Sequence, residues 1–362
     1  MRPTVHPQPL RAPACAVPVL SKASPALAFF ASAALAMALV GCTTPRAPEG
    51  AAAAQADLQG IAVKQGPAQD AGFIQRAMPG VGGAVLQTLQ RAERTAPLRY
   101  RVIVIPGSGC AGMGPIADRY FAGLLHAQVL VLHKPGVDPQ SQTKPADCPH
   151  PFVLQDRHST WLAQTRAALL ADALQRQGQS AVPQLLVGIS EGAELLPALA
   201  PEVPHLAGLV LIGASGLDPQ EAGALQARRM GAEGDWTALG QLVAGAPHDS
   251  VVVQGRSLGY WRDLWHWPVA QPLIDSPWPV LQVWGAEDAL VPVQAYERFA
   301  QRAAPRAPAG WCGRRFLGAD HGLQQQAANG ETSVDGVQRV WAWLEQWARA
   351  PQAGLCAPLL QQ

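Results

Sequence analysis

The chain has 362 residues, of which 48% are hydrophobic and 15% charged, a balance typical of a globular protein and not of a disordered chain. This length allows one large domain or two modest ones. The formal net charge is +1, and the 27 basic residues less Arg2, Arg11 and Lys22 leave 24 beyond residue 41 against 26 acidic residues. Such a near-neutral balance excludes a strong electrostatic basis for nucleic-acid binding, so we expect no nucleic-acid partner.

The first 41 residues are predicted to be a signal peptide. A basic leader through Lys22 precedes an apolar stretch, residues 26–40, which has the length of a signal-peptide core and is short for a membrane span. The stretch ends in LVGC, with Cys42 last, and this run resembles the lipobox of bacterial lipoproteins. The alternative is an ordinary cleaved signal, for which the ALA run at residues 34–36 could serve as the cleavage site.

The lipobox resemblance implies that Cys42 carries diacylglycerol, that the chain is cut before it, and that two or three acyl chains give stable membrane anchoring. Thr43 stands where aspartate would favour the inner membrane, so the resemblance implies an outer-membrane lipoprotein facing the periplasm. We expect residues 42–60, rich in Ala, Pro and Gly, to be a flexible tether. A folded domain is predicted over residues 61–350, followed by a C-terminal tail, residues 351–362.

Six apolar runs alternate with helical patterns from about residue 99. They are Tyr100–Ile105, Gln128–Leu132, Gln184–Ile189, Gly208–Ile212, Pro279–Trp284 and Arg314–Leu317. Most are continuous and not alternating, as expected for strands covered on both faces. The pattern predicts an α/β fold with a mostly parallel sheet flanked by helices, and residues 43–98 could add one or two antiparallel edge strands.

Two helical segments and one insertion accompany these strands. Between the second and third runs, a helix is expected with Leu162, Leu169, Leu170, Ala173 and Leu174 on one face. Another is expected from the valines and tryptophans of residues 334–347. Residues 216–277 interrupt the alternation and predict either a helical cap over a site or a pair of packed helices. The aromatics of this insertion could form a binding wall or the core of the cap: Trp261, Trp265 and Trp267.

Ser190 is the candidate nucleophile. It is the centre of Gly188-Ile189-Ser190-Glu191-Gly192, which follows the apolar run QLLVGI and precedes a predicted helix over residues 191–200. A G-x-S-x-G pentapeptide between a strand and a helix forms a tight turn that holds the serine hydroxyl above the sheet edge. The pentapeptide alone is weak support, and its strand–helix context strengthens it.

A serine nucleophile needs a general base and an acid that orients the base. After the fifth apolar run stands GAEDALVP, with Asp288, and after the sixth stands GADHG, with His321. The order serine, acid, histidine, each after a strand, resembles the α/β-hydrolase superfamily over roughly residues 99–350. The resemblance implies Ser190 as nucleophile, Asp288 as acid and His321 as base. Glu287 and Asp218 are alternative acids, Asp288 and His321 could be ordinary turn residues, and Asp320 is expected to be a turn residue.

The reaction also requires donors for the oxyanion of the tetrahedral intermediate. The superfamily resemblance implies the backbone N–H of Glu191 as one donor and an N–H from the loop after the first apolar run as the other. In that loop, PGSGC, Ser108 is favoured and Gly109 comes next. The loop lacks the spacing of either phosphate-binding glycine motif, so nucleotide binding is not expected. Lys134, in KPGV after the second run, could line the cleft, but a plain turn is the default interpretation.

Export would leave four cysteines in an oxidising compartment, where three pairings are possible. We favour the pairs Cys110–Cys148 and Cys312–Cys356, because each joins segments that flank neighbouring elements of the expected fold. Free buried thiols are the alternative. No C-x-x-C run or clustered histidine spacing occurs, so no metal site and no cofactor are expected.

These features predict an exported, lipid-anchored serine hydrolase whose substrate is a small ester or other acyl compound, with a carboxylic ester favoured. A peptidase or amidase of the same fold would use the same three residues. A non-catalytic envelope lipoprotein that uses this fold for binding is the other alternative, since fold alone does not fix function.

Overall fold

The structure is a computed structural model that describes residues 72–179, 181–245, 247–325 and 334–357. The predicted signal peptide, residues 1–41, the lipidation site Cys42 and the tether, residues 42–60, lie outside the described residues. Within the described ranges, no helix combines the length and the apolar character that a bilayer crossing would need.

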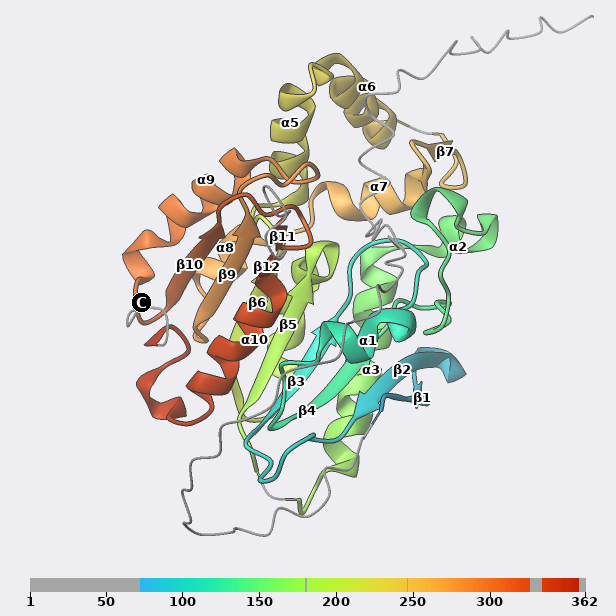
Figure 1. The fold of residues 1–362 in the computed structure, drawn as a ribbon. Helices are drawn as coiled ribbons and strands as arrows, with labels where there is room; N and C mark the ends of the chain where they lie inside the picture. The colour runs from blue at the N-terminus through green and yellow to red at the C-terminus, as the bar shows by residue number, and fades with distance from the viewer. Residues whose placement is uncertain (1–71, 180, 246, 326–333, 358–362) are drawn as a thin grey trace, which may run out of the picture.

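An eight-stranded sheet forms the centre of the molecule, in the order β1-β2-β4-β3-β5-β6-β9-β10 (Figure 1). Its strands are β1 (Ile74–Pro79), β2 (Val85–Arg91), β3 (Tyr100–Ile105), β4 (Ala127–Leu132), β5 (Gln184–Ile189), β6 (Leu206–Ile212), β9 (Val280–Gly285) and β10 (Trp311–Phe316). The last six run parallel, and all six apolar runs form them. The hairpin β1–β2 adds two antiparallel strands at the β4 edge.

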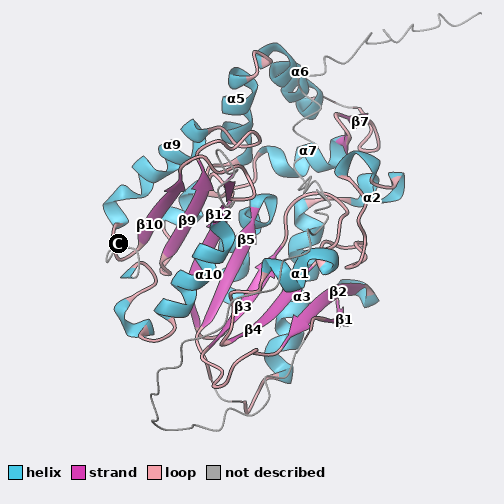
Figure 2. Ribbon diagram, viewed as in Figure 1, coloured by secondary structure: helices cyan, strands magenta, loops and turns pink. Residues whose placement is uncertain are grey.

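Helices cover both faces of this sheet (Figure 2). They are α1 (Gly114–Tyr120), α2 (His150–Gln155), α3 (His158–Gln175), α4 (Leu196–Leu199), α5 (Pro219–Arg229), α6 (Glu233–Ala244), α7 (Leu258–Trp265), α8 (Ala270–Ile274), α9 (Val293–Ala303) and α10 (Gly336–Trp347). In Figure 1, α1 and α10 lie on one face of the sheet, and α3 lies on the other.

Two hydrophobic cores result, one on each face. Alternate residues of β3 enter opposite cores, with Val102 and Val104 facing α1 and α10, and Ile103 and Ile105 facing α3, α4, α8 and α9. Such double coverage explains why the strand sequences are continuously apolar. The rigid sheet therefore holds the loops at its strand ends in fixed positions.

The helix predicted before β5 exists as α3, and Leu169 is buried in the core as expected, at 2% exposed, but two other leucines of the predicted face are not. Leu170 is 52% and Leu174 65% exposed. The buried positions include the polar residues His158 and Asp172, and Asp172 forms a buried ion pair with Arg101 of β3, with Nη2 2.7 Å from Oδ1. The prediction was wrong for Leu170 and Leu174, because polar residues share the core-facing stripe with Trp161 and Leu169 and shift it away from these two leucines.

Residues between β6 and β9 form α5 to α8 and a small hairpin, β7 (Val252–Val253) with β8 (Arg256–Ser257). In Figure 1, α5, α6 and α7 project beyond the sheet. Of the three tryptophans named above, Trp261 lines a pocket described below. Trp265 stacks on Trp236 with ring centroids 4.7 Å apart, and Trp267 packs on the core of the α3 face. The aromatic run thus supplies both core and pocket wall.

Two disulfides join Cys110 to Cys148 and Cys312 to Cys356, with Cα–Cα distances of 5.7 and 5.8 Å, the two pairs favoured by the sequence. The second disulfide fastens β10 to the segment that follows α10. Leu355 and Cys356 are buried in the core next to α10. The first part of the expected C-terminal tail is therefore packed against the domain.

Candidate active site

Ser190 follows β5 directly and has a φ of +52°, in the left-handed region that non-glycine residues rarely occupy. The flanking glycines are required by close backbone approach. A Cβ at Gly188 would lie 2.3 Å from the Cα of Ala193, and one at Gly192 would lie 2.1 Å from the carbonyl oxygen of Pro106. The G-x-S-x-G run therefore forms the strained strand-to-helix turn that presents the serine hydroxyl.

The chain after Ser190 is less regular than the single helix predicted over residues 191–200. It forms a 3₁₀ segment, Ser190–Leu195, then the short α4, and then a second 3₁₀ turn, Ala200–Glu202. Pro197 and Pro201 lack the N–H that a continuous α-helix needs, which explains the breaks. The turn still begins at Ser190, so the N–H of Glu191 stays at the start of a helical segment.

Asp288 and His321 come from two loops that the sheet brings together, after β9 and after β10. His321 Nδ1 lies 2.8 Å from Asp288 Oδ2. Asp288 is 3% exposed and also accepts the N–H groups of Leu290 and Val291 at Oδ1. The buried hydroxyl of Tyr296 donates to Oδ2 at 2.6 Å. These bonds fix the carboxylate so that it orients the imidazole of His321.

The same hydrogen bonds affect the ionisation of Asp288 and Tyr296. Burial acts to raise the pKa of Asp288, but the hydrogen bonds from His321 and Tyr296 outweigh burial and hold that pKa below its usual value. Burial and the neighbouring Asp288 raise the pKa of Tyr296 well above its usual value. Asp288 is thus a carboxylate at neutral pH, and Tyr296 is a protonated donor to it.

The structure gives the alternative acids, Glu287 and Asp218, and the neighbouring Asp320 different surroundings from those of Asp288. Glu287 is exposed, unlike its neighbour Asp288. Asp218 accepts the N–H groups of Val269 and Ala270 at 2.7 and 2.8 Å and so joins the two ends of the inserted segment. Asp320 is exposed and accepts the N–H of Gln324, as a turn residue does.

His321 and Ser190 flank the same small region. A Cβ at Gly213 would lie 3.2 Å from His321 Cε1, and Gly213 lines the pocket that contains Ser190. Within the described residues no hydrogen bond joins Ser190 Oγ to His321. Catalytic hydrogen bonds of this kind are often long in the free protein and shorten when substrate binds.

The loop after β3 lies against the turn at residues 188–192, called here the nucleophile turn because Ser190 is the predicted nucleophile. A Cβ at Gly107 would lie 3.4 Å from the Cβ of Ser190, and Gly109 has a φ of +89°. Ser108 lines the pocket with Ser190 and Glu191, and its buried hydroxyl has no hydrogen-bond partner in the part of the chain that the structure describes. No backbone hydrogen bond within the described residues uses the N–H of Ser108 or Gly109. These N–H groups are therefore available for the oxyanion-binding role that the sequence predicts for them.

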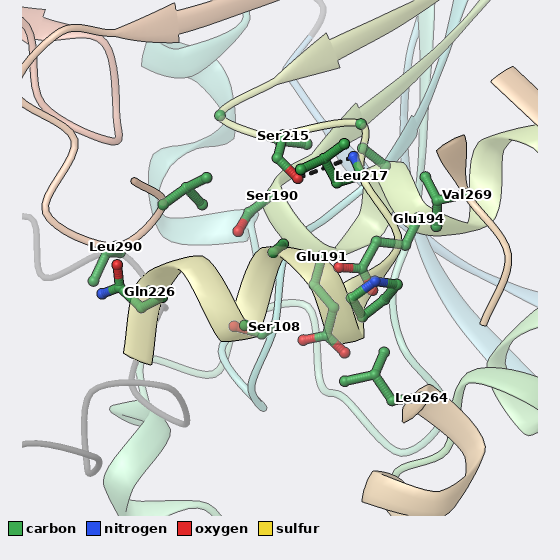
Figure 3. Close-up of a pocket in the computed structure, with 18 of the residues that line it drawn as sticks. Ser108, Ser190, Glu191, Glu194, Ser215, Leu217, Gln226, Leu264, Val269 and Leu290 are labelled. Atoms are coloured by element: carbon green, nitrogen blue, oxygen red, sulfur yellow. Dashed lines mark hydrogen bonds between the residues drawn. The ribbon is translucent and has the colours of Figure 1, made fainter. Parts of the chain in front are cut away.

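The pocket beside Ser190 encloses about 140 Å³. Figure 3 shows Ser190 between Gln226 and Leu290 on one side and Glu194, Leu264 and Val269 on the other. Most of its lining is apolar, including Trp236, Tyr260 and Trp261 of the inserted segment. Pockets for drug-sized ligands usually enclose about 300–1,000 Å³, so this one is suited to a small chemical group.

A buried ionic cluster stands behind the nucleophile turn; its members are Lys134, Asp156, Glu191 and Arg256. Lys134 Nζ lies 2.9 Å from Asp156 Oδ1 and 2.7 Å from Glu191 Oε1. Arg256 contacts Asp156 and lies 3.6 Å from Glu191 Oε2. All four side chains are at least nine-tenths buried. Burial opposes ionisation of Glu191, but the adjacent cations dominate and lower its pKa well below the usual value.

The sequence does not predict this cluster, and the default interpretation of Lys134 is a residue of a plain turn. Its members come from four separate segments, and only a three-dimensional arrangement brings their charges together. The signal that could have found it is Glu191 itself, an acidic residue inside an otherwise apolar turn. No group of His, Cys, Asp and Glu in the described ranges is arranged to hold a metal ion.

The Cys110–Cys148 disulfide holds the loop that carries Ser108. For the ester hydrolysis that the sequence predicts, we expect the double substitution C110S/C148S to lower kcat about tenfold, because a loosened loop would misplace the predicted oxyanion donor. The matched variant C312S/C356S should lower the free energy of unfolding by about 2–4 kcal/mol and leave kcat unchanged. Ester assays and urea unfolding of both variants measure this. Equal kcat losses in the two variants would show that the first disulfide has no special link to the site.

No protein-family model matches the sequence, and no curated protein matches it. Solved structures do resemble it. A puromycin hydrolase mutant complexed with PGG has a TM-score of 0.54 at 12% identity, and another puromycin hydrolase structure has 0.51 at 14%. Each match covers 80% of this chain and 40% of the other, so this chain spans about two fifths of their length. An esterase domain from Rhodothermus marinus has a TM-score of 0.47 at 19% identity, covering 76% and 98%.

At these identities the likeness concerns the fold alone. Together with the mostly parallel sheet and its flanking helices, it confirms the α/β-hydrolase fold predicted from the sequence.

Proposed function

We propose that this protein is a serine hydrolase that cleaves a carboxylic ester through an acyl-enzyme intermediate. The observation that carries the proposal is Ser190 at positive φ, beside a small pocket, with the bonded pair Asp288–His321 at the neighbouring strand ends. Solved structures of similar fold include an esterase domain and puromycin hydrolases, which supports a hydrolase.

The proposed reaction follows from the positions of these groups. His321 Nε2 takes the proton of Ser190 Oγ while the oxygen attacks the ester carbonyl, and Asp288 stabilises the imidazolium. The N–H groups of Glu191 and of Ser108 or Gly109 bind the oxyanion. His321 then protonates the departing alcohol, and a water, deprotonated by the same histidine, attacks the acyl group and releases Ser190.

For location, we propose export and lipid anchoring at Cys42 in the bacterial cell envelope, with the domain facing the periplasm. The support is the LVGC run after a basic leader and an apolar core, together with two disulfides, which persist in oxidising compartments.

The test uses the full-length protein, expressed in a bacterial host and purified in detergent. We expect a fluorophosphonate probe to label the wild-type protein at Ser190, located by mass spectrometry of the labelled peptide, and to leave S190A unlabelled. Turnover of p-nitrophenyl acetate should accompany labelling. An unlabelled, inactive wild-type protein would contradict the hydrolase proposal and favour a binding role for the fold.

A peptidase or amidase is the second candidate, favoured by the likeness to puromycin hydrolases, one of which is described as a peptidase. It predicts the same labelling of Ser190 but cleavage of alanine p-nitroanilide with little turnover of p-nitrophenyl acetate. The ratio of these two activities separates the two proposals.

A further inference from the structure

The charged side chains among the described residues that line the Ser190 pocket are both acidic, Glu191 and Glu194. They differ in their partners. Lys134 and Arg256 neutralise Glu191 from behind the pocket. The Glu194 carboxylate is hydrogen-bonded, among the described residues, by His158 alone, whose Nε2 lies 2.7 Å from Oε2. One carboxylate oxygen of Glu194 is therefore left for a ligand, and its side chain is 24% exposed.

A second, independent group in the pocket also lacks a hydrogen-bond donor that a ligand could supply. Gln226, on α5, is 3% exposed and lines the pocket. Its Nε2 donates to the carbonyl oxygen of Ala289 at 3.4 Å and to Met230 Sδ at 3.5 Å, whereas Oε1 has no hydrogen-bond partner within the described ranges. Leaving a buried acceptor unpaired is unfavourable, so a ligand that brings a donor is preferred there. Figure 3 shows Gln226 and Glu194 on opposite sides of Ser190.

The remaining lining suits a positively charged ligand. Aromatic rings attract ammonium groups over their faces, and Trp236 and Trp261 line the pocket. Tyr260 lines it too, but its ring already has Arg256 4.7 Å from its centroid. Burial raises the pKa of Glu194, so a bound cation would favour its charged form. No lysine or arginine among the described residues lines the pocket to compete for this carboxylate.

We propose that this pocket selects substrates that carry a small ammonium group close to the ester, with Glu194 as the specificity-determining residue that binds it. This inference rests on the proposed hydrolase function and names its substrate class. The ammonium would lie against Glu194 Oε1, with the aromatic wall around it and the ester carbonyl at Ser190. The enclosed volume of about 140 Å³ limits the group to a few heavy atoms.

The test compares three p-nitrophenyl esters of nearly equal size, those of alanine, lactic acid and isobutyric acid. They place an ammonium, a hydroxyl or a methyl group at the same carbon. Each kcat/KM of the wild-type protein is divided by the rate constant of spontaneous hydroxide hydrolysis, which removes differences in intrinsic reactivity. Protonated 2-(dimethylamino)ethyl acetate, whose ammonium keeps an N–H donor, and 3-methylbutyl acetate form the corresponding pair for an ammonium on the alcohol side.

We expect the corrected kcat/KM to favour the ammonium ester about tenfold or more in at least one series, as for a hydrogen bond to a charged group. E194Q, which keeps the shape and a hydrogen bond to His158, should reduce that preference to near one. The matched control E297Q removes an equal charge from the exposed face of α9 and should leave both the preference and the rates unchanged.

Several results would overturn the inference. Equal corrected values for ammonium and methyl esters in the wild-type protein would do so without any variant. If the corrected kcat/KM of the lactate ester equals that of the alanine ester, the pocket selects any hydrogen-bond donor and not a positive charge. If E194Q keeps the wild-type preference, Glu194 is not the residue that binds the ammonium group. A wild-type protein that turns over none of the esters would instead contradict the proposed function itself.

Discussion

Replacing Ser190 by alanine is expected to lower kcat for an ester by about 10⁵- to 10⁶-fold, because the acyl-enzyme route is then closed. H321A should cost a similar factor, since the serine hydroxyl is a weak nucleophile without a base to accept its proton. The double variant S190A/H321A should be no slower than either single variant, because the residues act as one unit. Single-turnover assays with p-nitrophenyl acetate measure all three.

The acid position offers a matched control for this prediction. D288N should lower kcat by about 10⁴-fold, because a neutral amide in place of the carboxylate would leave the imidazole without the acceptor that orients and stabilises it. E287Q removes the same charge one residue earlier, from an exposed side chain, and should leave kcat unchanged. A loss in E287Q as large as that in D288N, or a double variant slower than both single ones, would contradict the assignment of the three residues.

The sequence predicted the strands and the chain order of the site because each depends on local information. Continuous apolar runs follow from burial on both faces of the sheet, and Gly188 is required by its close approach to the backbone of Ala193 within the turn. The acid and histidine follow strand ends, so an α/β alternation places them at one edge of the sheet. The positions of Asp288 and His321 could therefore be predicted without coordinates.

The parts that could not be predicted depend on contacts between distant segments. The exposure of Leu170 and Leu174 on α3 could not be predicted, because Asp172 occupies the core-facing stripe through its ion pair with Arg101 on β3. The roles of Glu194 and Gln226 could not be predicted, because the two residues line one pocket only when the inserted segment packs over the nucleophile turn. No pattern in the sequence relates Arg256 to Asp156, 100 residues earlier.

The buried ionic cluster leads to the largest expected effect on stability. Replacing Arg256 by methionine should lower the free energy of unfolding at pH 7 by about 3–5 kcal/mol, because it leaves Asp156 and Glu191 buried with too little positive charge. Arg302 supplies the matched control. It is paired with Glu221 at 2.8 Å, but its side chain is 42% exposed, so R302M should cost about 0–1 kcal/mol. Urea unfolding followed by tryptophan fluorescence measures both.

A loss of charge and a loss of packing predict different pH dependences for the free energy of unfolding of R256M. The pKa of Glu191 is lowered in the folded protein, so its stabilisation is complete above the pKa of an unfolded glutamate and is lost as pH falls toward the folded value. The stability gap between wild type and R256M should therefore narrow as pH falls below about 5. Because Arg256 belongs to the inserted segment and Glu191 follows the nucleophile, the same acidification should loosen the segment over Ser190. A gap that stays constant from pH 7 to pH 4 would show that Arg256 stabilises the fold by packing and not by charge.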